Sequence, residues 1–167
     1  VKNSKLFLKT QELSNNKFSE EVLNRFKKFN VNTGRIVLEG KSKTREEVLE
    51  TYRHIDISLD PFPFQGNTST CESVWMGVPV LTLKGDRYLS HFGESINSNL
   101  NMKDWIADSK DDYLKKAINF SSDIDRLEKI RMSLRKSASL SAVFDSDRFS
   151  KHFAAILWDM WKNFKKK

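Results

Sequence analysis

Residues 54–83 read HIDISLDPFPFQGNTSTCESVWMGVPVLTL, and this stretch decides the fold class. The run 55–59 predicts a strand, and the apolar spacing over 71–76 predicts a helix that ends at Gly77. The run 78–83 is nearly all apolar, which is typical of a parallel strand covered on both faces. A strand, a helix and a second strand joined by short connections indicate a βαβ unit.

The chain before this unit repeats the same alternation. Short apolar runs predict strands at 6–8 and at 35–38. Apolar residues recur at helical spacing over 18–29, and Thr44-x-x-Glu47 has the form of a capping box that opens another helix. Strands that alternate with helices are the mark of a doubly wound α/β layer.

The chain after Gly85 shows helical patterns alone. Helices are predicted to begin near residues 90, 109 and 123, and a terminal helix is predicted at about 145–164. Its apolar side includes Trp158 and Trp161, which predicts packing against a core. We therefore expect an α/β protein with a Rossmann-like, doubly wound parallel sheet and extra C-terminal helices, in a single domain over 1–167.

Composition and charge exclude several classes of protein. Hydrophobic residues at 38% and aromatic residues at 11% argue against intrinsic disorder. The net charge is +7, but without the lysines at 162 and 165–167 the balance is 25 basic against 22 acidic residues, which disfavours a nucleic-acid partner. No run approaches 18 apolar residues, so we expect no membrane span. The one cysteine, Cys71, favours a reducing compartment, and we expect a cytoplasmic protein.

Metal sites and cysteine nucleophiles are not predicted. The three histidines have no metal-ligand spacing; they are His54, His91 and His152. Cys71 has no histidine at a spacing that would support a nucleophile, and its apolar helix predicts a core position.

The turn after the third strand, DPFPFQGNTSTCE over 60–72, is the most unusual segment. Two prolines stiffen it, and Gly66 permits a close backbone approach. The N–H groups and the dipole at a helix N-terminus favour an anion, to which the hydroxyls of Thr68 and Ser69 can add donors. Glu72 lies one turn further on, where a carboxylate can accept hydrogen bonds from ribose hydroxyls.

A purely structural interpretation of the same turn stays open on the residues alone. Ser69-x-x-Glu72 is itself a capping box, and Asn67 or Thr68 is an ordinary N-cap residue. The spacing of a Walker loop is absent, and so is the Gly-x-Gly-x-x-Gly pattern of dinucleotide-binding proteins. The motif therefore marks a candidate phosphate site and leaves its ligand open.

The run 54–83, continued by Gly85-Asp86-Arg87 and Met160-Trp161, resembles a known family. That family is the O-linked N-acetylglucosamine transferase and SPINDLY-like group of glycosyltransferases, and the resemblance covers nearly the whole chain. It implies the C-terminal half of a GT-B fold, which has two Rossmann-like halves and binds the nucleotide sugar mainly through the second. The chain is then a fragment of a larger two-domain enzyme.

The resemblance also implies which residues hold the donor. The stretch corresponding to 66–69 holds the diphosphate at a helix N-terminus, the acidic residue bonds the ribose, and a cation upstream contacts the nucleotide. The cofactor-binding positions carried over in this way are Gly66, Asn67, Thr68, Ser69, Glu72 and Arg45. The resemblance implies no metal and no cofactor beyond the donor substrate, and it places the catalytic groups largely in the other half, so no catalytic residue is expected in this chain.

Three positions depart from the family pattern. Asn67 stands where His or Thr is common, and it keeps a hydrogen-bonding side chain. Val48 stands where His is frequent, which removes a contact to the base. His91 stands where Arg is usual. The missing base contact leaves the choice of donor nucleotide open.

Three functional hypotheses follow from the sequence. The first is the nucleotide-sugar-binding half of an inverting protein O-glycosyltransferase, which moves N-acetylglucosamine from UDP-N-acetylglucosamine to protein Ser/Thr and is inactive without its N-terminal half. A SPINDLY-like O-fucosyltransferase half that uses GDP-fucose is the alternative donor assignment. The second is a non-catalytic binding module of the same fold, and the third, a nucleic-acid-binding domain, is disfavoured by the charge balance. The expected partners are a nucleotide sugar, the N-terminal half and a protein acceptor.

Overall fold

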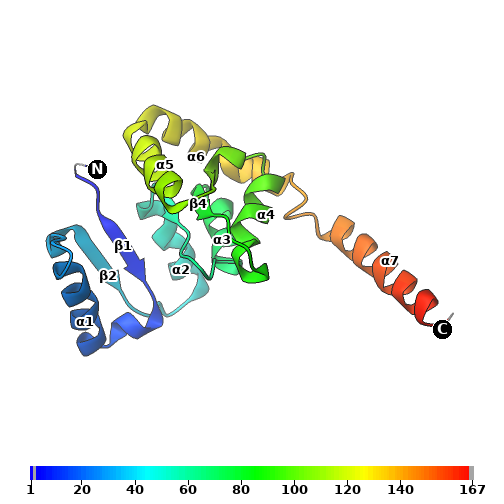
Figure 1. Cartoon of the computed structure of the whole chain (residues 1–167), viewed down its shortest axis with the longest axis horizontal. Coiled ribbons are helices and arrows are strands. Elements are labelled where there is room, and N and C mark those ends of the chain that lie inside the picture. The colour runs from blue at the N-terminus through cyan, green and yellow to red at the C-terminus, as the bar shows by residue number, and fades with distance from the viewer. Residues whose placement is uncertain (2, 166–167) are drawn as a thin grey trace. The chain divides into compact units, whose positions relative to one another are not determined.

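The computed structural model describes residues 1 and 3–165. The described chain divides into two compact units, of which the first ends at Ile55 and the second begins at Asp56 (Figure 1). The strands are β1 (Leu6–Lys9), β2 (Ile36–Glu39), β3 (Ser58–Leu59), β4 (Val80–Leu83) and β5 (Ile106–Ala107). The helices are α1 (Asn16–Lys27), α2 (Arg45–Thr51), α3 (Thr68–Trp75), α4 (Phe92–Asn99), α5 (Lys110–Ser122), α6 (Ile124–Ser139) and α7 (Ser146–Phe164). The expectation of one domain over the whole chain stays a prediction.

The first unit is a parallel pair of strands with helices between and after them. β1 pairs with β2 in a register that places Leu6 opposite Ile36. Asn15 caps α1 by accepting hydrogen bonds from the N–H groups of the helix's first turn, and the Thr44 hydroxyl caps α2 by accepting the Glu47 N–H at 3.3 Å. The predicted strands and helices of this region are confirmed.

The second unit is built around a three-stranded parallel sheet in the order β3-β4-β5. Ser58 pairs with Val80 and Thr82 with Ile106, so β4 lies in the middle. The predicted third strand, 55–59, is confirmed only over its last two residues, and the fourth begins at Val80. β4 pairs with β3 through Val80 and Leu81 and with β5 through Thr82 and Leu83.

The expectation of helices alone after Gly85 is wrong at one place. Ile106 and Ala107 form β5, which extends the sheet beyond β4. The Lys84 N–H donates to the Ala107 carbonyl at 2.8 Å, and the Trp105 ring beside the strand is buried. Two residues carry no periodicity of their own, so only pairing with β4 identifies them as a strand.

β4 carries a hydrophobic core on each face, as its continuous apolar sequence predicts. Val80 packs with α3, α4 and α6; its buried partners are Val74, Ile96, Leu100, Leu134 and Ala138. Leu81 faces the opposite way and packs with buried Trp105, Phe120 and Leu127, which come from the segment before β5 and from α5 and α6. Figure 1 shows these helices gathered around β4. The sheet of this unit is therefore covered on both sides.

Gly77 ends α3 in the left-handed conformation that the sequence predicts. Its φ is +78°, and a Cβ there would lie 3.0 Å from the Arg131 carbonyl oxygen. We expect Gly77→Ala to lower the free energy of unfolding by about 1–2 kcal/mol, because an L-residue is strained in this region. Chemical denaturation measures the change. Gly34→Ala is the control, since Gly34 has no positive φ; an equal loss in both variants would contradict the expectation.

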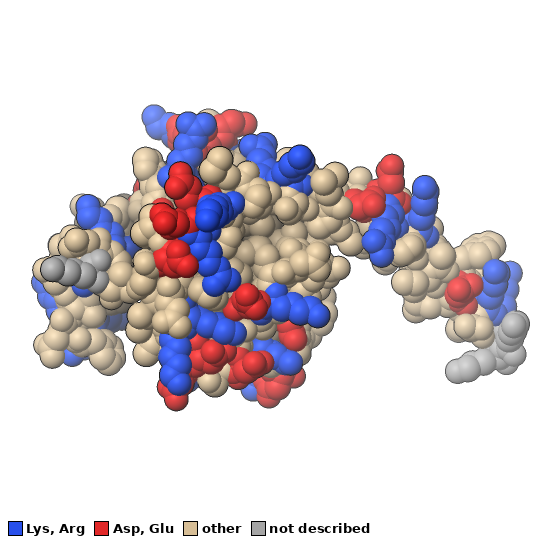
Figure 2. Space-filling model, turned by 90° about the horizontal axis from the view of Figure 1, so that it is seen from above, with Lys and Arg blue, Asp and Glu red and all other residues tan. Residues whose placement is uncertain are grey.

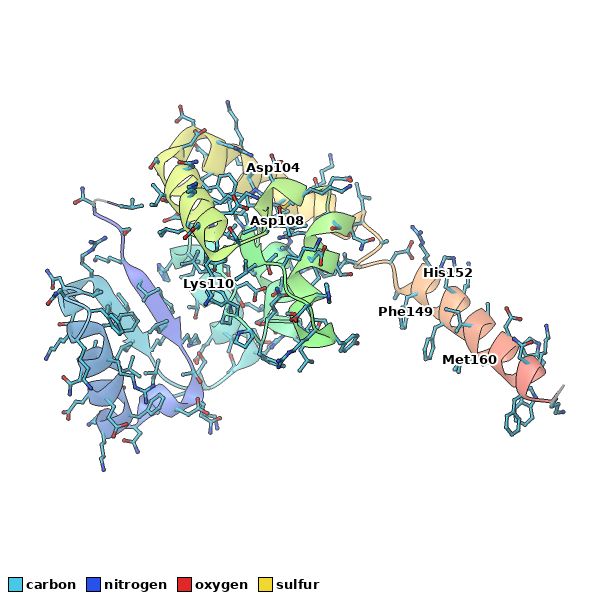
Figure 3. All side chains as sticks on the ribbon, in the orientation of Figure 1. Asp104, Asp108, Lys110, Phe149, His152 and Met160 are labelled. Carbon is cyan, nitrogen blue, oxygen red and sulfur yellow. The ribbon has the colours of Figure 1, made fainter. Side chains whose placement is uncertain are left out.

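The terminal helix forms as predicted, but its apolar side is exposed. Trp158 is 61% exposed and Trp161 48%, so the expectation that these rings pack into the core is wrong for the described part of the chain. Figure 3 shows the side chains of Phe149, His152 and Met160 along this helix. Its local amphipathic pattern fixes a helix, whereas burial requires a second element against it.

Candidate functional site

The candidate site lies where the chain leaves β3 and enters α3. In open parallel sheets, ligands bind beyond the carboxyl ends of the strands. The segment 60–67 leaves the carboxyl end of β3, and Gly85 follows the carboxyl end of the neighbouring β4. The turn that the sequence singles out therefore stands at the edge of the sheet where ligands are bound in this architecture.

The Asp60 side chain holds the two ends of the turn together and ties them to β4. Its side chain is buried, and one carboxyl oxygen accepts the Gly66 N–H at 2.8 Å while the other accepts the Thr82 hydroxyl at 2.8 Å. Burial raises the pKa of the Asp60 carboxyl, and the two hydrogen bonds oppose that rise. The Tyr113 hydroxyl of α5 donates to the Asp60 backbone carbonyl at 3.1 Å. The turn is thus tied to β4 and to α5.

The start of α3 differs from an ordinary capped helix. Asn67 is the N-cap residue, and among the described contacts its side chain makes no capping hydrogen bond. Ser69 is the second residue of α3, so the predicted Ser69-x-x-Glu72 capping box does not form. The first intrahelical bond runs from the Cys71 N–H to the Asn67 carbonyl at 3.1 Å. The earlier N–H groups of this turn lie outside the intrahelical ladder, as at any helix N-terminus.

The turn closes tightly at Gly66. The Thr70 hydroxyl donates to the Gly66 carbonyl at 2.9 Å. A Cβ at Gly66 would lie 2.6 Å from the Ser69 Oγ and 2.8 Å from the Thr70 Oγ1. A side chain here would have to displace the Ser69 and Thr70 hydroxyls, because the helix start folds back onto this residue. The Gly66 N–H is already used by Asp60, so Gly66 shapes the turn through its lack of a side chain.

The structure brings five of the six predicted site residues into one segment. Asn67, Thr68 and Ser69 are exposed at the start of α3, and Gly66 and Glu72 are half-buried on either side of them. The sixth, Arg45, is the first residue of α2 and belongs to the other compact unit, so its role stays a prediction.

The sequence interpretation missed several buried or half-buried groups that shape the turn. They are Asp60, Gln65, Thr82, Gly93 and Tyr113. The sequence marks only Asp60 and Gln65, as the polar residues at the two ends of the proline-rich segment. Thr82, Gly93 and Tyr113 come from β4, α4 and α5.

An aromatic side flanks the turn. Phe62 contacts Tyr113 edge-on, with ring centroids 5.6 Å apart, and the Lys110 ammonium lies 5.8 Å from the centre of the Phe62 ring. Figure 3 labels Lys110 at the start of α5. Phe64 is 63% exposed and immediately precedes Gln65 and Gly66.

The side chains of Cys71 and His91 have structural surroundings or partners. The Cys71 side chain is half-buried against the core of α3, and burial followed by the nearby Glu72 charge raises the pKa of its thiol. His91 pairs with Glu94 at 2.7 Å, and this hydrogen bond, with the nearby Lys84, lowers the pKa of Glu94. Within residues 1 and 3–165, no three His, Cys, Asp or Glu side chains gather as a metal site would require.

The described surface mixes charges of both signs. Figure 2 shows Lys and Arg interspersed with Asp and Glu over the face that it draws. Among the described residues, none of the helices has the length and apolar character needed to cross a membrane.

Comparison with known proteins decides the family. A sequence model described as glycosyl transferase family 41 matches residues 3–153. The chain belongs to glycosyl transferase family 41. The match includes the turn at 66–69 and all of the sheet, so the resemblance carried by the run 54–83 is confirmed.

Curated relatives of this family 41 chain are plant and animal proteins. It is 30% identical over 98% of its length to a protein of Eustoma exaltatum subsp. russellianum, and 36% identical over 70% of its length to one of Solanum lycopersicum. Both relatives are named probable UDP-N-acetylglucosamine–peptide N-acetylglucosaminyltransferase SPINDLY. The chain spans 18% and 12% of these two proteins.

A solved structure shows the same fold. The chain matches a mutant of the Thermobaculum terrenum O-GlcNAc transferase with a TM-score of 0.81 and 28% sequence identity, over 95% of this chain and 30% of that chain. The predicted fold class is confirmed: a Rossmann-like α/β layer with parallel strands from a GT-B enzyme, followed by extra helices.

Proposed function

We propose that this family 41 chain is the nucleotide-sugar-binding half of an inverting protein O-glycosyltransferase. The proposed reaction moves N-acetylglucosamine from UDP-N-acetylglucosamine to Ser/Thr of a protein acceptor in the cytoplasm. Family membership supports the reaction class, and the names of the relatives support the donor. The observation that carries the proposal is the exposed start of α3, which follows the carboxyl end of β3 and has no side-chain cap from Asn67.

The turn's part in the reaction is to hold the nucleoside diphosphate as it leaves. Negative charge grows on the diphosphate when the bond to the sugar breaks. The positive end of the α3 dipole and the hydroxyls of Thr68 and Ser69 can stabilise that charge, because all three lie at the exposed start of the helix. Glu72, one turn along the same helix, is placed to accept hydrogen bonds from the ribose hydroxyls, and Arg45 is proposed as a further cation.

The remaining functions are assigned to the rest of the enzyme. We propose that acceptor binding and the groups that assist sugar transfer lie in the N-terminal half, because the positions that the family pattern carries over to this chain are nucleotide-binding ones. The chain by itself is therefore expected to bind the nucleotide and to transfer no sugar. Sugar transfer by the isolated 167 residues, measured with radiolabelled donor and a peptide acceptor, would contradict this assignment.

Titration with UDP and with GDP tests the binding site directly. The amide signals of 66–72 are followed by NMR, and we expect them to shift more than those of α5 and α6. Stronger binding of UDP supports the proposed donor, whereas stronger binding of GDP would assign the site to GDP-fucose. No binding of either nucleotide would leave a non-catalytic module of the same fold.

Removal of one proposed hydrogen-bond donor to the diphosphate, the Thr68 hydroxyl, tests the site by mutation. We expect Thr68→Ala to weaken UDP binding about 10-fold or more, because a hydrogen bond to a charged group contributes roughly 1.5–3 kcal/mol. Isothermal titration calorimetry measures the affinity. Ser122→Ala is the matched control: it also deletes a hydroxyl, but one that bonds the Ile118 carbonyl of its own helix at 2.8 Å. Equal affinities for Thr68→Ala and wild type would reject Thr68 as a donor.

A further inference from the structure

Two buried polar side chains bracket the proline-rich segment that leads into the turn. Asp60 begins the segment and is 3% exposed, and Gln65 ends it and is 1% exposed. The residues between them are exposed. A buried polar group is costly unless its hydrogen bonds are made, so the partners of these two side chains show what they stabilise.

Gln65 connects the turn to two other elements. Its side-chain amide donates to the Leu83 carbonyl of β4 at 2.5 Å, and its side-chain oxygen accepts the Gly93 N–H of α4 at 2.8 Å. Its backbone N–H donates to the Leu89 carbonyl at 3.3 Å. One side chain therefore holds the residue before Gly66 against the end of β4 and the first turn of α4.

Asp60 completes this network from the other end of the segment. It links the Gly66 N–H to the Thr82 hydroxyl of β4, each at 2.8 Å. A Cβ on Gly93 would lie 2.5 Å from the second Asp60 carboxyl oxygen, so α4 begins directly against this carboxyl group. The turn, the end of β4 and the start of α4 thus share one buried set of hydrogen bonds.

We propose that Asp60 and Gln65 are positioning residues that set the geometry of the 66–69 turn for the nucleotide diphosphate. They touch no ligand themselves. They hold Gly66 and the start of α3 in one arrangement, so that the backbone of the turn needs no ordering when the diphosphate binds. This inference rests on the proposed function of the turn, and it adds that the grip depends on contacts with β4 and α4.

The chemistry of the Asp60 contacts supplies a conservative variant. Asparagine at this position can accept the Gly66 N–H through its oxygen and donate to the Thr82 hydroxyl through its amide, whereas alanine can do neither. We expect Asp60→Ala and Gln65→Ala to weaken UDP binding at least 10-fold. Asp60→Asn is expected to stay within about threefold of wild type.

Leu134→Ala separates positioning from a general loss of stability. Leu134 is buried in α6 and packs against Val80 and Ala138, so its truncation destabilises the same unit without touching the network. We expect Leu134→Ala to leave UDP affinity unchanged at temperatures where the protein is folded. Affinity unchanged in Asp60→Ala, or lost equally in Leu134→Ala, would overturn the proposal.

Amide hydrogen exchange tests the same proposal in the ligand-free 167-residue chain. The Gly66 and Gly93 N–H groups are expected to be protected in wild type and in Asp60→Asn. Gln65→Ala is expected to speed exchange at Gly93 more than at Leu100, a residue near the other end of α4. Wild-type protein that binds neither UDP nor GDP would refute the proposed function, and rapid exchange of Gly66 and Gly93 in wild type would refute the positioning role.

Discussion

Leu81→Ala is expected to lower the free energy of unfolding of the second unit by about 2–5 kcal/mol. Leu81 is fully buried on the middle strand and packs against Trp105, Phe120 and Leu127. Alanine would leave a cavity among these side chains, because the sheet on one side and two helices on the other limit how far the site can collapse. A loss of this size is a large fraction of the stability of an ordinary domain.

Urea denaturation followed by tryptophan fluorescence measures this loss. All four tryptophans lie in the second unit, so the signal reports on the unit that contains Leu81. Leu140→Ala is the matched control: Leu140 is 80% exposed, and its truncation is expected to change stability by less than about 0.5 kcal/mol. Equal midpoints for the two variants would show that β4 does not carry the core described above.

Gly93→Ala is expected to lower the free energy of unfolding by about 1–3 kcal/mol, because it overpacks the core where Leu81→Ala would leave a cavity. The added Cβ would overlap the Thr82 hydroxyl and lie 2.5 Å from an Asp60 carboxyl oxygen. Both neighbours are buried and hydrogen-bonded to each other, so neither can move without breaking that bond. The methyl group therefore forces α4 away from β4.

Denaturation and NMR together identify this displacement. Besides the lost stability, we expect the Gly66 amide signal to shift, since Gly66 shares Asp60 with the start of α4. Ser95→Ala is the control, because Ser95 is exposed on the same helix and alanine favours helices. A Gly93→Ala protein that unfolds with wild-type stability would mean that the two elements approach less closely than the structure shows.

The sequence predicted those helix boundaries whose signals lie within one turn. Thr44 and Ser109 accept the N–H groups three residues ahead, as the capping patterns require, and Gly77 takes the left-handed conformation. The capping pattern at Ser69 was misleading, because α3 begins one residue earlier and Thr70 bonds back to Gly66 instead. A capping pattern predicts the start of a helix correctly where its first residue is the N-cap, as at Thr44 and Ser109, and it fails at Ser69, where Asn67 is the N-cap.

The position of the candidate site was predictable, and its construction was not. The turn at 60–72 can be recognised in the sequence by the apolar strand before it, two prolines, a glycine and a run of hydroxyl residues. The contacts of Asp60 and Gln65 could not be predicted, because their partners Thr82, Leu83 and Gly93 are between 18 and 33 residues away. Only a folded chain brings them together.

The sequence by itself determined the family, the α/β alternation and the position of the candidate site, because each depends on residues that are neighbours in the chain. Tertiary structure alone decided that Ile106 and Ala107 form a strand, that Asp60 and Gln65 are buried, and that Trp158 is exposed. The physical reason is the same in each case. Pairing and burial are properties of two segments in contact, and a residue's own neighbours in the chain carry no record of the segment that will lie against it.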